Sequence, residues 1–263
     1  PATASGFHAR GAWVWLPPAW FTSRRSDLPV VELLSGTPGD PRDWMRGGHA
    51  ISTLDAFARA HDGRAPVVVI VDENGSFHGD TECVNRPGSR SETYVTVDVV
   101  HALVQHFGLA STGWTIVGDS EGGTCALTLA LRHPALYRSF GDYAGDPAPN
   151  IGNARNSLRV LFEGSVLRKR AYDPGYLLRR HSLIGARAGF CVGHEARRQR
   201  QIAREAARTR ADGAATRVWR GSTGHDFYTW SSCFARSIGW LTAGHHHAGP
   251  PTDAPPPVDP SAN

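Results

Sequence analysis

Short apolar segments, separated by Gly, Pro and Asp, recur along the chain and predict β-strands. Several of them, such as PVVVIV, are apolar at every position rather than at every second one. That pattern is typical of strands covered on both faces, as in a parallel sheet between two layers of helices. The predicted strands are residues 11–16, 28–34, 66–71, 114–117, 139–143, 159–162, 189–192 and 216–219.

Segments with apolar residues three or four positions apart lie between these strands and predict helices. They are residues 52–61, 92–107, 122–132, 196–211 and 228–241. The alternation predicts an α/β fold, with a mostly parallel central sheet and helices on both faces, in a single domain over residues 1–243. Residues 244–263 hold His245, His246, His247 and a Pro-rich end, which predict a flexible tail.

One short motif in this pattern carries candidate chemistry. Residues 118–122 read Gly-Asp-Ser-Glu-Gly and fit G-x-S-x-G, between an apolar strand and a helix rich in Ala and Leu. This is the strand–turn–helix setting of a nucleophile elbow, in which small neighbours such as Gly118 and Gly122 allow a strained turn. We therefore predict that Ser120 is a nucleophile, placed where N–H groups of a helix start favour negative charge.

A serine hydroxyl needs a base to become a good nucleophile. His225 lies in the Gly-rich segment 221–227, after the last predicted strand and before the last helix. In folds with a nucleophile elbow, the histidine follows the serine and the acid in the chain. The sequence thus predicts His225 as the base.

The acid of the triad is expected between these two residues, after the preceding strand. Glu195 ends the segment 189–195 and is the first candidate. Glu205, within the predicted helix 196–211 that follows, is the alternative. Asp173 and Asp146 are less favoured. A glutamate at a helix start is also an ordinary N-terminal charge, so the sequence leaves the choice open.

Two backbone donors are needed to stabilise an oxyanion. The first expected donor is the N–H of Glu121, directly after the nucleophile, and the second is the N–H of Thr37, in the loop after the strand at residues 28–34. Gly36 lets the backbone of that loop approach closely, and Pro38 has no backbone N–H to donate. The candidate substrate-binding residues are Gly36, Trp44, Asn74 and Ser76.

The charge composition excludes little. Lys and Arg number 28 against 24 Asp and Glu, a net charge of +4, and they concentrate only at residues 168–170 and 197–210. A solvated helix face explains this pattern better than a nucleic-acid site, so we expect no nucleic-acid partner, while attraction to an anionic membrane surface stays open.

No metal site and no cofactor are expected, because the four cysteines lack zinc-ligand spacing. No apolar run approaches the roughly 18 residues of a membrane span.

Four segments together resemble one known family. They are VWLPPAW at residues 14–20, LLSGTPGDPRDW at 33–44, GDSEGGTCALTLALRHP at 118–134 and GSTGHDFYTW at 221–230. They are similar to the esterase family of the α/β-hydrolases that includes esterase D and the mycobacterial mycolyltransferases. The resemblance implies the α/β-hydrolase fold over residues 11–241, with Ser120 in the elbow, His225 as the base and an oxyanion N–H from Thr37.

The chain departs from this family pattern at three places. Ser35 stands where many relatives have His before the Gly of the oxyanion loop. Asp119 and Glu121 flank the nucleophile and are expected to put negative charge beside it. The position of the triad acid matches no clear motif.

The resemblance implies a serine esterase that forms an acyl-enzyme on Ser120 and acts on a small-molecule or lipid acyl ester. An acyltransferase that passes the acyl group to a sugar hydroxyl is the alternative, and a catalytically inactive binding domain is another. Relatives of this kind are often exported, which implies an extracytoplasmic protein. In that case Cys83–Cys125 with Cys191–Cys233 is one of the three pairings that four cysteines allow. The oligomeric state stays open.

Overall fold

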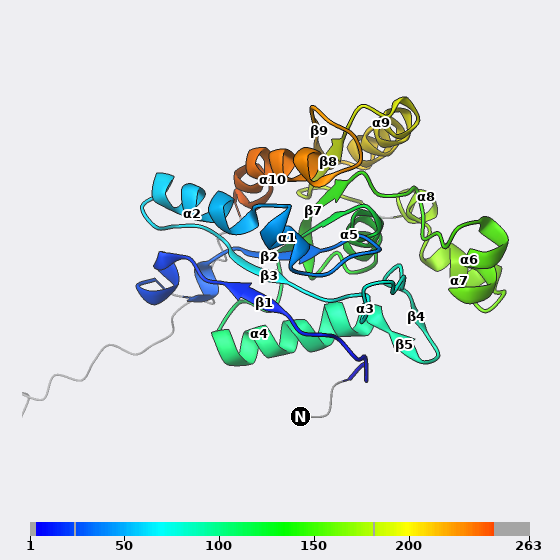
Figure 1. The fold of residues 1–263 in the computed structure, drawn as a ribbon, viewed down its shortest axis with the longest axis horizontal. Coiled ribbons are helices and arrows are strands. Elements are labelled where there is room, and N and C mark those ends of the chain that lie inside the picture. Colours follow the sequence, from blue (N-terminus) through cyan, green and yellow to red (C-terminus); the bar gives the residue numbers. More distant parts are fainter. Residues whose placement is uncertain (1–3, 24, 181, 245–263) are drawn as a thin grey trace, which may run out of the picture.

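A seven-stranded sheet organises the computed structural model, which describes residues 4–23, 25–180 and 182–244 (Figure 1). The strand order is β1-β3-β2-β6-β7-β8-β9, and every neighbouring pair is parallel except β1 with β3. The strands are β1 (Trp13–Trp15), β2 (Val30–Leu34), β3 (Val67–Ile70), β6 (Trp114–Asp119), β7 (Tyr137–Tyr143), β8 (Arg187–Val192) and β9 (Ala215–Arg220).

Helices cover both faces of this sheet. The longer ones are α2 (Ala50–Ala60), α4 (Val100–Phe107), α5 (Glu121–Arg132), α9 (Ala196–Ala211) and α10 (Phe227–Thr242). Shorter ones are α1 (Asp43–Arg46), α3 (Ser91–Thr93), α6 (Ala154–Val160), α7 (Val166–Ala171) and α8 (Pro174–Leu177). A π-helical segment (Tyr94–Val99), two 3-10 turns (Pro18–Phe21 and Arg25–Asp27) and a small hairpin of β4 (Asn85–Arg86) and β5 (Ser89–Arg90) complete the described chain.

The continuously apolar strands have the role that their sequence predicts. All five residues of β2 and all four of β3 are buried. Alternate residues face opposite layers: Val31 and Leu33 pack with α2 and α10, whereas Val30 and Leu34 pack with α4 and α5. The predicted α/β fold, with a mostly parallel central sheet and helices on both faces, is thus confirmed.

Two segments differ from their prediction. Residues 159–162, predicted as a strand, form the end of α6 and the turn after it, and Leu161 and Phe162 are buried beside Tyr172. A short apolar run looks the same in a buried strand and in a buried helix end, which explains the error. Residues 92–107 form three consecutive helical pieces rather than one helix.

Two disulfides join the loop after β3 to α5 and the strand β8 to α10. Cys83 pairs with Cys125, and Cys191 pairs with Cys233, each across 42 positions of sequence. Of the three pairings that four cysteines allow, this is the one named above as possible for an exported protein. Among the described residues, none of the helices has the length and apolar character needed to cross a membrane. The predicted tail lies, from residue 245 on, outside the described residues.

Candidate active site

A tight turn between β6 and α5 carries Ser120. The residue has φ 52° and ψ −120°, a backbone conformation that side chains other than glycine rarely adopt. Its N–H donates to the carbonyl of Tyr143 at 2.9 Å, which ties the turn to β7. A Cβ at Gly118 would lie 2.0 Å from the carbonyl oxygen of Gly122, so the turn requires glycine there. The sequence motif therefore folds as the predicted elbow.

His225 reaches this turn from the loop between β9 and α10. Its Nε2 lies 2.8 Å from Oγ of Ser120, although 105 positions separate the two residues in sequence. The loop is fixed from the following residue, because the Asp226 carboxylate caps α10 by accepting from the N–H of Thr229 and from the hydroxyl of Thr223. The structure thus brings together the two residues that the sequence selected.

The surroundings of His225 favour its neutral form. Desolvation is the largest cause that lowers its pKa below the usual value, and the positive charge of Arg198 lowers it further. The carboxylates of Glu195, Asp146 and Asp226 oppose this shift. A neutral imidazole at pH 7 is the form that can accept a proton from a serine hydroxyl.

Glu195 is the carboxylate best placed to assist His225. It lies between β8 and α9, and its Oε1 would be 3.3 Å from a Cβ at Gly224, the residue before His225. Its Oε2 is buried and has no hydrogen-bond partner among the residues that the structure describes. Of the carboxylates that raise the pKa of His225, Glu195 has the largest effect.

The other candidate acids lie elsewhere. Glu205 is buried further along α9 beside Asp142, and burial raises its pKa to about 8. Asp173 caps α8 by accepting from the N–H of Tyr176. Asp146 pairs with Arg198 at 3.3 Å. The geometry therefore favours Glu195 over Glu205.

The loop 35–39, called the oxyanion loop below, packs directly against the elbow. A Cβ at Gly36 would lie 2.8 Å from Cβ of Ser120, so only glycine allows this approach. The Thr37 hydroxyl donates to the carbonyl of Gly79 at 2.6 Å, and the Gly39 N–H donates to the carbonyl of Phe77 at 2.9 Å. The backbone of Thr37 is therefore held close to the serine.

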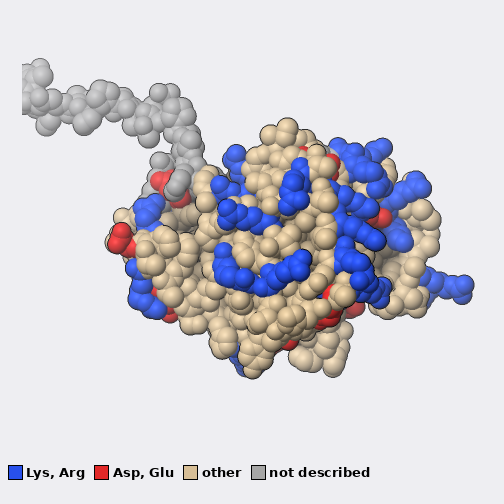
Figure 2. All heavy atoms as spheres, turned by 90° about the horizontal axis from the view of Figure 1, so that it is seen from above, with Lys and Arg blue, Asp and Glu red and all other residues tan. Residues whose placement is uncertain are grey.

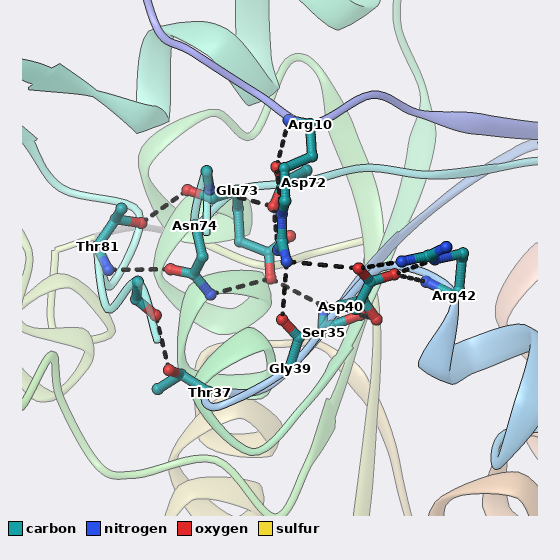
Figure 3. A network of polar contacts seen from close by, with 12 residues as sticks. Arg10, Ser35, Thr37, Gly39, Asp40, Arg42, Asp72, Glu73, Asn74 and Thr81 are labelled. Atoms are coloured by element: carbon teal, nitrogen blue, oxygen red, sulfur yellow. Dashed lines mark hydrogen bonds and ion pairs between the residues drawn. The ribbon is translucent and has the colours of Figure 1, made fainter. Parts of the chain in front are cut away.

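A network of charged side chains fixes the base of the oxyanion loop, as Figure 3 shows. The guanidinium of Arg10 binds Asp72 at 2.6 Å and the carbonyl of Gly39 at 3.2 Å. Glu73 accepts from the N–H of Ser35 at 2.9 Å. Because these bonds connect the loop to residues just after β3, the sheet itself positions the expected oxyanion donor.

The acids that flank the serine are buried and carry less charge than the sequence suggested. Burial raises the pKa of Asp119 and of Glu121 to about 8, so both are mostly protonated at pH 7. The amide of Asn74 donates to Glu121 at 2.9 Å and accepts from the N–H of Thr81 at 3.0 Å. The expected negative charge beside the nucleophile is therefore largely absent, because both carboxyl groups are enclosed in the core.

A small cavity of about 140 Å³ opens at the serine. Its lining includes Gly36 and Thr37 on one side and two aromatic residues of α10, Phe227 and Trp230, on the other. The ring of Trp230 meets His225 edge-on with centroids 4.9 Å apart. These two aromatic residues were not among the predicted site residues, although they follow His225 at positions 227 and 230, one helix turn apart.

The remaining predicted wall residues lie away from this cavity. Trp44 is completely buried, and its indole N–H donates to the carbonyl of Leu34, so its assignment to the substrate wall is wrong. Its ring packs against Phe227 and Phe234 of α10, in the core between α1 and α10. Asn74 is buried beneath the elbow, and Ser76 is exposed in the loop after β3.

Within the described chain, one group of side chains has the spacing of metal ligands: Cys83, Glu121 and Cys125. The two sulfur atoms belong to a disulfide and the carboxyl is largely protonated at pH 7. These groups are poor ligands for a cation.

An elbow serine at the carboxyl edge of a mostly parallel sheet, with a histidine from the loop after the last strand, defines an α/β-hydrolase. The family described as "Putative esterase" matches residues 8–240, and the chain belongs to this esterase family.

Individual relatives and solved structures agree with this family. The chain is 32% identical over 253 residues to an uncharacterized protein of Corynebacterium glutamicum, covering 91% of this chain and 58% of that protein. It is 28% identical over 159 residues to diacylglycerol acyltransferase/mycolyltransferase Ag85B of Mycolicibacterium smegmatis, covering 49% of this chain and 48% of the relative. The fold matches an S-formylglutathione hydrolase from Agrobacterium tumefaciens with a TM-score of 0.66, 20% identity and 88% of each chain covered. The chain thus spans about half the length of these two sequence relatives.

Proposed function

We propose that the protein is a serine esterase in which Ser120 is the nucleophile and His225 the general base. The observation that carries this proposal is the 2.8 Å contact between Nε2 of His225 and Oγ of Ser120. Glu195 acts through His225 by favouring the imidazolium that forms during the reaction. Membership of the esterase family supports the same reaction class.

The reaction follows from this arrangement. His225 takes the proton of the Ser120 hydroxyl while Oγ attacks the ester carbonyl, and the N–H groups of Thr37 and Glu121 stabilise the oxyanion. His225 then gives the proton to the departing alcohol, which leaves an acyl group on Ser120. Water, activated by the same imidazole, hydrolyses this acyl-enzyme and restores the serine.

The cavity at Ser120 favours a short acyl group. Its volume of about 140 Å³ is below the roughly 300–1,000 Å³ that pockets for drug-sized ligands occupy. We therefore expect acetyl and butyryl esters to be better substrates than octanoyl or longer esters. A series of p-nitrophenyl esters measures this preference, and fastest turnover of the long chains would contradict it.

Substitution of the serine tests the nucleophile. We expect Ser120→Ala to lower kcat for p-nitrophenyl acetate by at least about a thousandfold, because the covalent route is lost. A fluorophosphonate should label the unsubstituted protein on Ser120 and leave Ser120→Ala unlabelled, as followed by mass spectrometry. Comparable turnover by the two proteins would remove Ser120 from the mechanism, and a folded protein without label would favour an inactive binding domain.

An acyltransferase uses the same residues, and the similarity to Ag85B is the observation that favours it as the second candidate. The two activities differ only in the acceptor that attacks the acyl-enzyme. Addition of trehalose or another polyol to the ester assay separates them. Appearance of an acylated sugar would identify a transferase, and release of free acid alone would identify an esterase.

We also propose an extracytoplasmic location. Both disulfides are formed and no described cysteine is free, which is typical of proteins in oxidising compartments. Alkylation of the protein in intact cells, before and after reduction, measures its thiols. Four reactive thiols without reduction would contradict the proposal.

A further inference from the structure

A second and larger hollow, called the cationic cleft below, opens on the side of His225 away from the oxyanion loop. Its volume is about 770 Å³. Loop residues after β7, the helices α6 and α7, and the start of α9 form its walls. His225 and Glu195 belong to the lining, so the cationic cleft and the small cavity meet at the imidazole.

Three cations and two carboxylates line the cationic cleft, so its lining has a net positive charge. Asp146 is paired with Arg198 at 3.3 Å, and the charge of Glu195 raises the pKa of His225. Lys169 and Arg197, which also line the cleft, have no acidic partner among the described side chains. Lys169 is also the one lysine of the whole sequence, in which every other fixed cation is an arginine.

A narrower hollow of about 300 Å³ continues from the cationic cleft along α9 and is called the arginine groove below. The two hollows share Pro147, Arg197 and Gln201. The arginine groove adds three arginines on the same face of α9, at positions 200, 204 and 208. Figure 2 shows Lys and Arg side chains gathered on the side of the molecule that carries α9 in Figure 1.

The row of arginines places like charges three or four positions apart along α9. Like charges three or four positions apart on a helix repel each other. The acid within the same groove, Glu205, is buried, and its pKa of about 8 leaves it mostly neutral at pH 7. No described carboxylate forms an ion pair with Arg197, Arg200 or Arg204. An anion from outside the chain would remove the repulsion.

We propose that the cationic cleft and the arginine groove bind the alcohol part of the ester, and that this alcohol carries phosphate or carboxylate groups. The inference rests on the proposed esterase function and extends it to the substrate class. His225 must reach the oxygen of the departing alcohol, and His225 lines the cationic cleft. The acyl group then occupies the small cavity between the oxyanion loop and α10.

The length of the arginine groove indicates more than one anionic group. Arg197 and Arg208 are 11 positions apart, which corresponds to about 16 Å along a helix. A single phosphate is too small to contact all the arginines along this length. The structure therefore favours an alcohol in which negative charges recur, with the first of them near Lys169 and Arg197.

The test compares two esters that differ only in charge on the alcohol: 1-acetylglycerol 3-phosphate and 1-acetylglycerol. Acetate release gives kcat/KM for each ester. We expect a preference of about tenfold or more for the phosphorylated ester at low salt, the scale of one charge-assisted hydrogen bond. The preference should decrease in 0.5 M NaCl, a concentration that screens exposed charges to roughly a few ångströms.

Matched substitutions locate the effect. In Lys169→Gln/Arg197→Gln, the ratio of the two kcat/KM values should fall to about one, whereas Arg59→Gln/Arg64→Gln, on α2 and the loop after it, should keep the ratio of the unsubstituted protein. Thermal unfolding verifies that each variant is folded. Polyglutamate, which carries recurring negative charges, should inhibit turnover of the phosphorylated ester by binding the arginine groove. Arg200→Gln/Arg204→Gln, a second variant outside the cationic cleft, should weaken this inhibition, and inhibition that stays unchanged would overturn the part of the proposal that concerns the groove.

The outcomes separate this inference from the proposed function. Equal kcat/KM for the two esters, with turnover that still requires Ser120, would overturn the anionic-alcohol site and leave the esterase in place. A preference that survives Lys169→Gln/Arg197→Gln would also overturn it, because the charge would then be recognised elsewhere. Turnover of both esters by Ser120→Ala would instead contradict the proposed function.

Discussion

The two sides of Ser120 are built differently. On one side, the oxyanion loop is held by a buried hydrogen bond to Glu73, by the hydrogen bond from Arg10 to the carbonyl of Gly39 and by contacts to residues 77–79. On the other side, the cationic cleft is lined by half-exposed and exposed cations that mostly lack partners. We infer from this difference that the first side sets the position of the reacting atoms, and that the second side selects what binds. Changes on the first side should lower the rate for every ester, and changes on the second should depend on the ester.

Glu195 lies where the two sides meet and should give the largest effect. We expect Glu195→Gln to lower kcat for p-nitrophenyl acetate on the order of a thousandfold, because the imidazolium loses its charged partner. Glu205→Gln, on the helix α9 that begins directly after Glu195, is the matched control and should retain nearly full activity. If Glu205→Gln were the damaging substitution, our assignment of the acid would be wrong.

A methyl group added to the oxyanion loop tests the first side of Ser120, where the loop is held by hydrogen bonds. In Gly36→Ala, the added Cβ would lie 2.8 Å from Cβ of Ser120 and 3.1 Å from Oδ2 of Asp119, so the loop must move outward. We expect kcat to fall about a hundredfold for neutral and anionic esters alike, since one oxyanion donor is displaced. A loss confined to anionic esters would show that the loop selects substrates.

The two disulfides separate stability from activity. Both enclose 42 positions, so the chain-entropy estimate gives each about 4 kcal/mol of stabilisation. Cys125 lies one helix turn after Glu121, whereas Cys191 and Cys233 join β8 to α10. Urea unfolding of Cys83→Ser/Cys125→Ser and of Cys191→Ser/Cys233→Ser should show similar losses of stability.

Activity at a temperature where both variants stay folded gives the sharper comparison. Loss of Cys83–Cys125 should reduce kcat more, because this bond anchors the residues beneath the elbow. Equal activity of the two double variants would mean that the position of the elbow does not depend on the Cys83–Cys125 disulfide.

The smallest effect should be a shift in pH dependence. The pKa of His225 is lowered, so the acid limb of kcat/KM should have its midpoint below the usual histidine value of about 6.5. Removal of the nearby charge in Arg198→Gln should raise this midpoint, and Arg198→Lys should keep it low. A midpoint that moves down in Arg198→Gln would mean that its contacts with Ala144 and Gly145 matter more than its charge.

The sequence predicted those features that depend on short segments. The continuously apolar β2 and β3 and the elbow between β6 and α5 have local patterns, and they appear in the structure as expected. Trp44 was misassigned because a tryptophan near a candidate loop looks the same whether it points to the core or to solvent. Burial of Asp119 and Glu121 depends on the surrounding layers, which no local pattern reports.

The cationic cleft could not be predicted for the same reason. Lys169 and Arg197 come from α7 and α9, on either side of β8, and only the packing of the chain after β7 brings them to one hollow. The sequence showed both basic segments but gave no reason to join them. The contact between Ser120 and His225 was predictable because the order of those residues along the chain follows from the fold class.

The enclosed acids beneath the elbow couple folding to proton uptake. Glu121 and Asp119 release their protons near pH 4 in an unfolded chain, but retain them to about pH 8 in the folded protein. Between these values these two groups bind fewer protons in the unfolded state, so their contribution to the free energy of unfolding should decrease as the pH rises from about 4 to 8 and change little beyond. Refolding at pH 7 in a weakly buffered solution should therefore make the solution more alkaline, and Asp119→Asn/Glu121→Gln should reduce that change by up to about two protons per molecule.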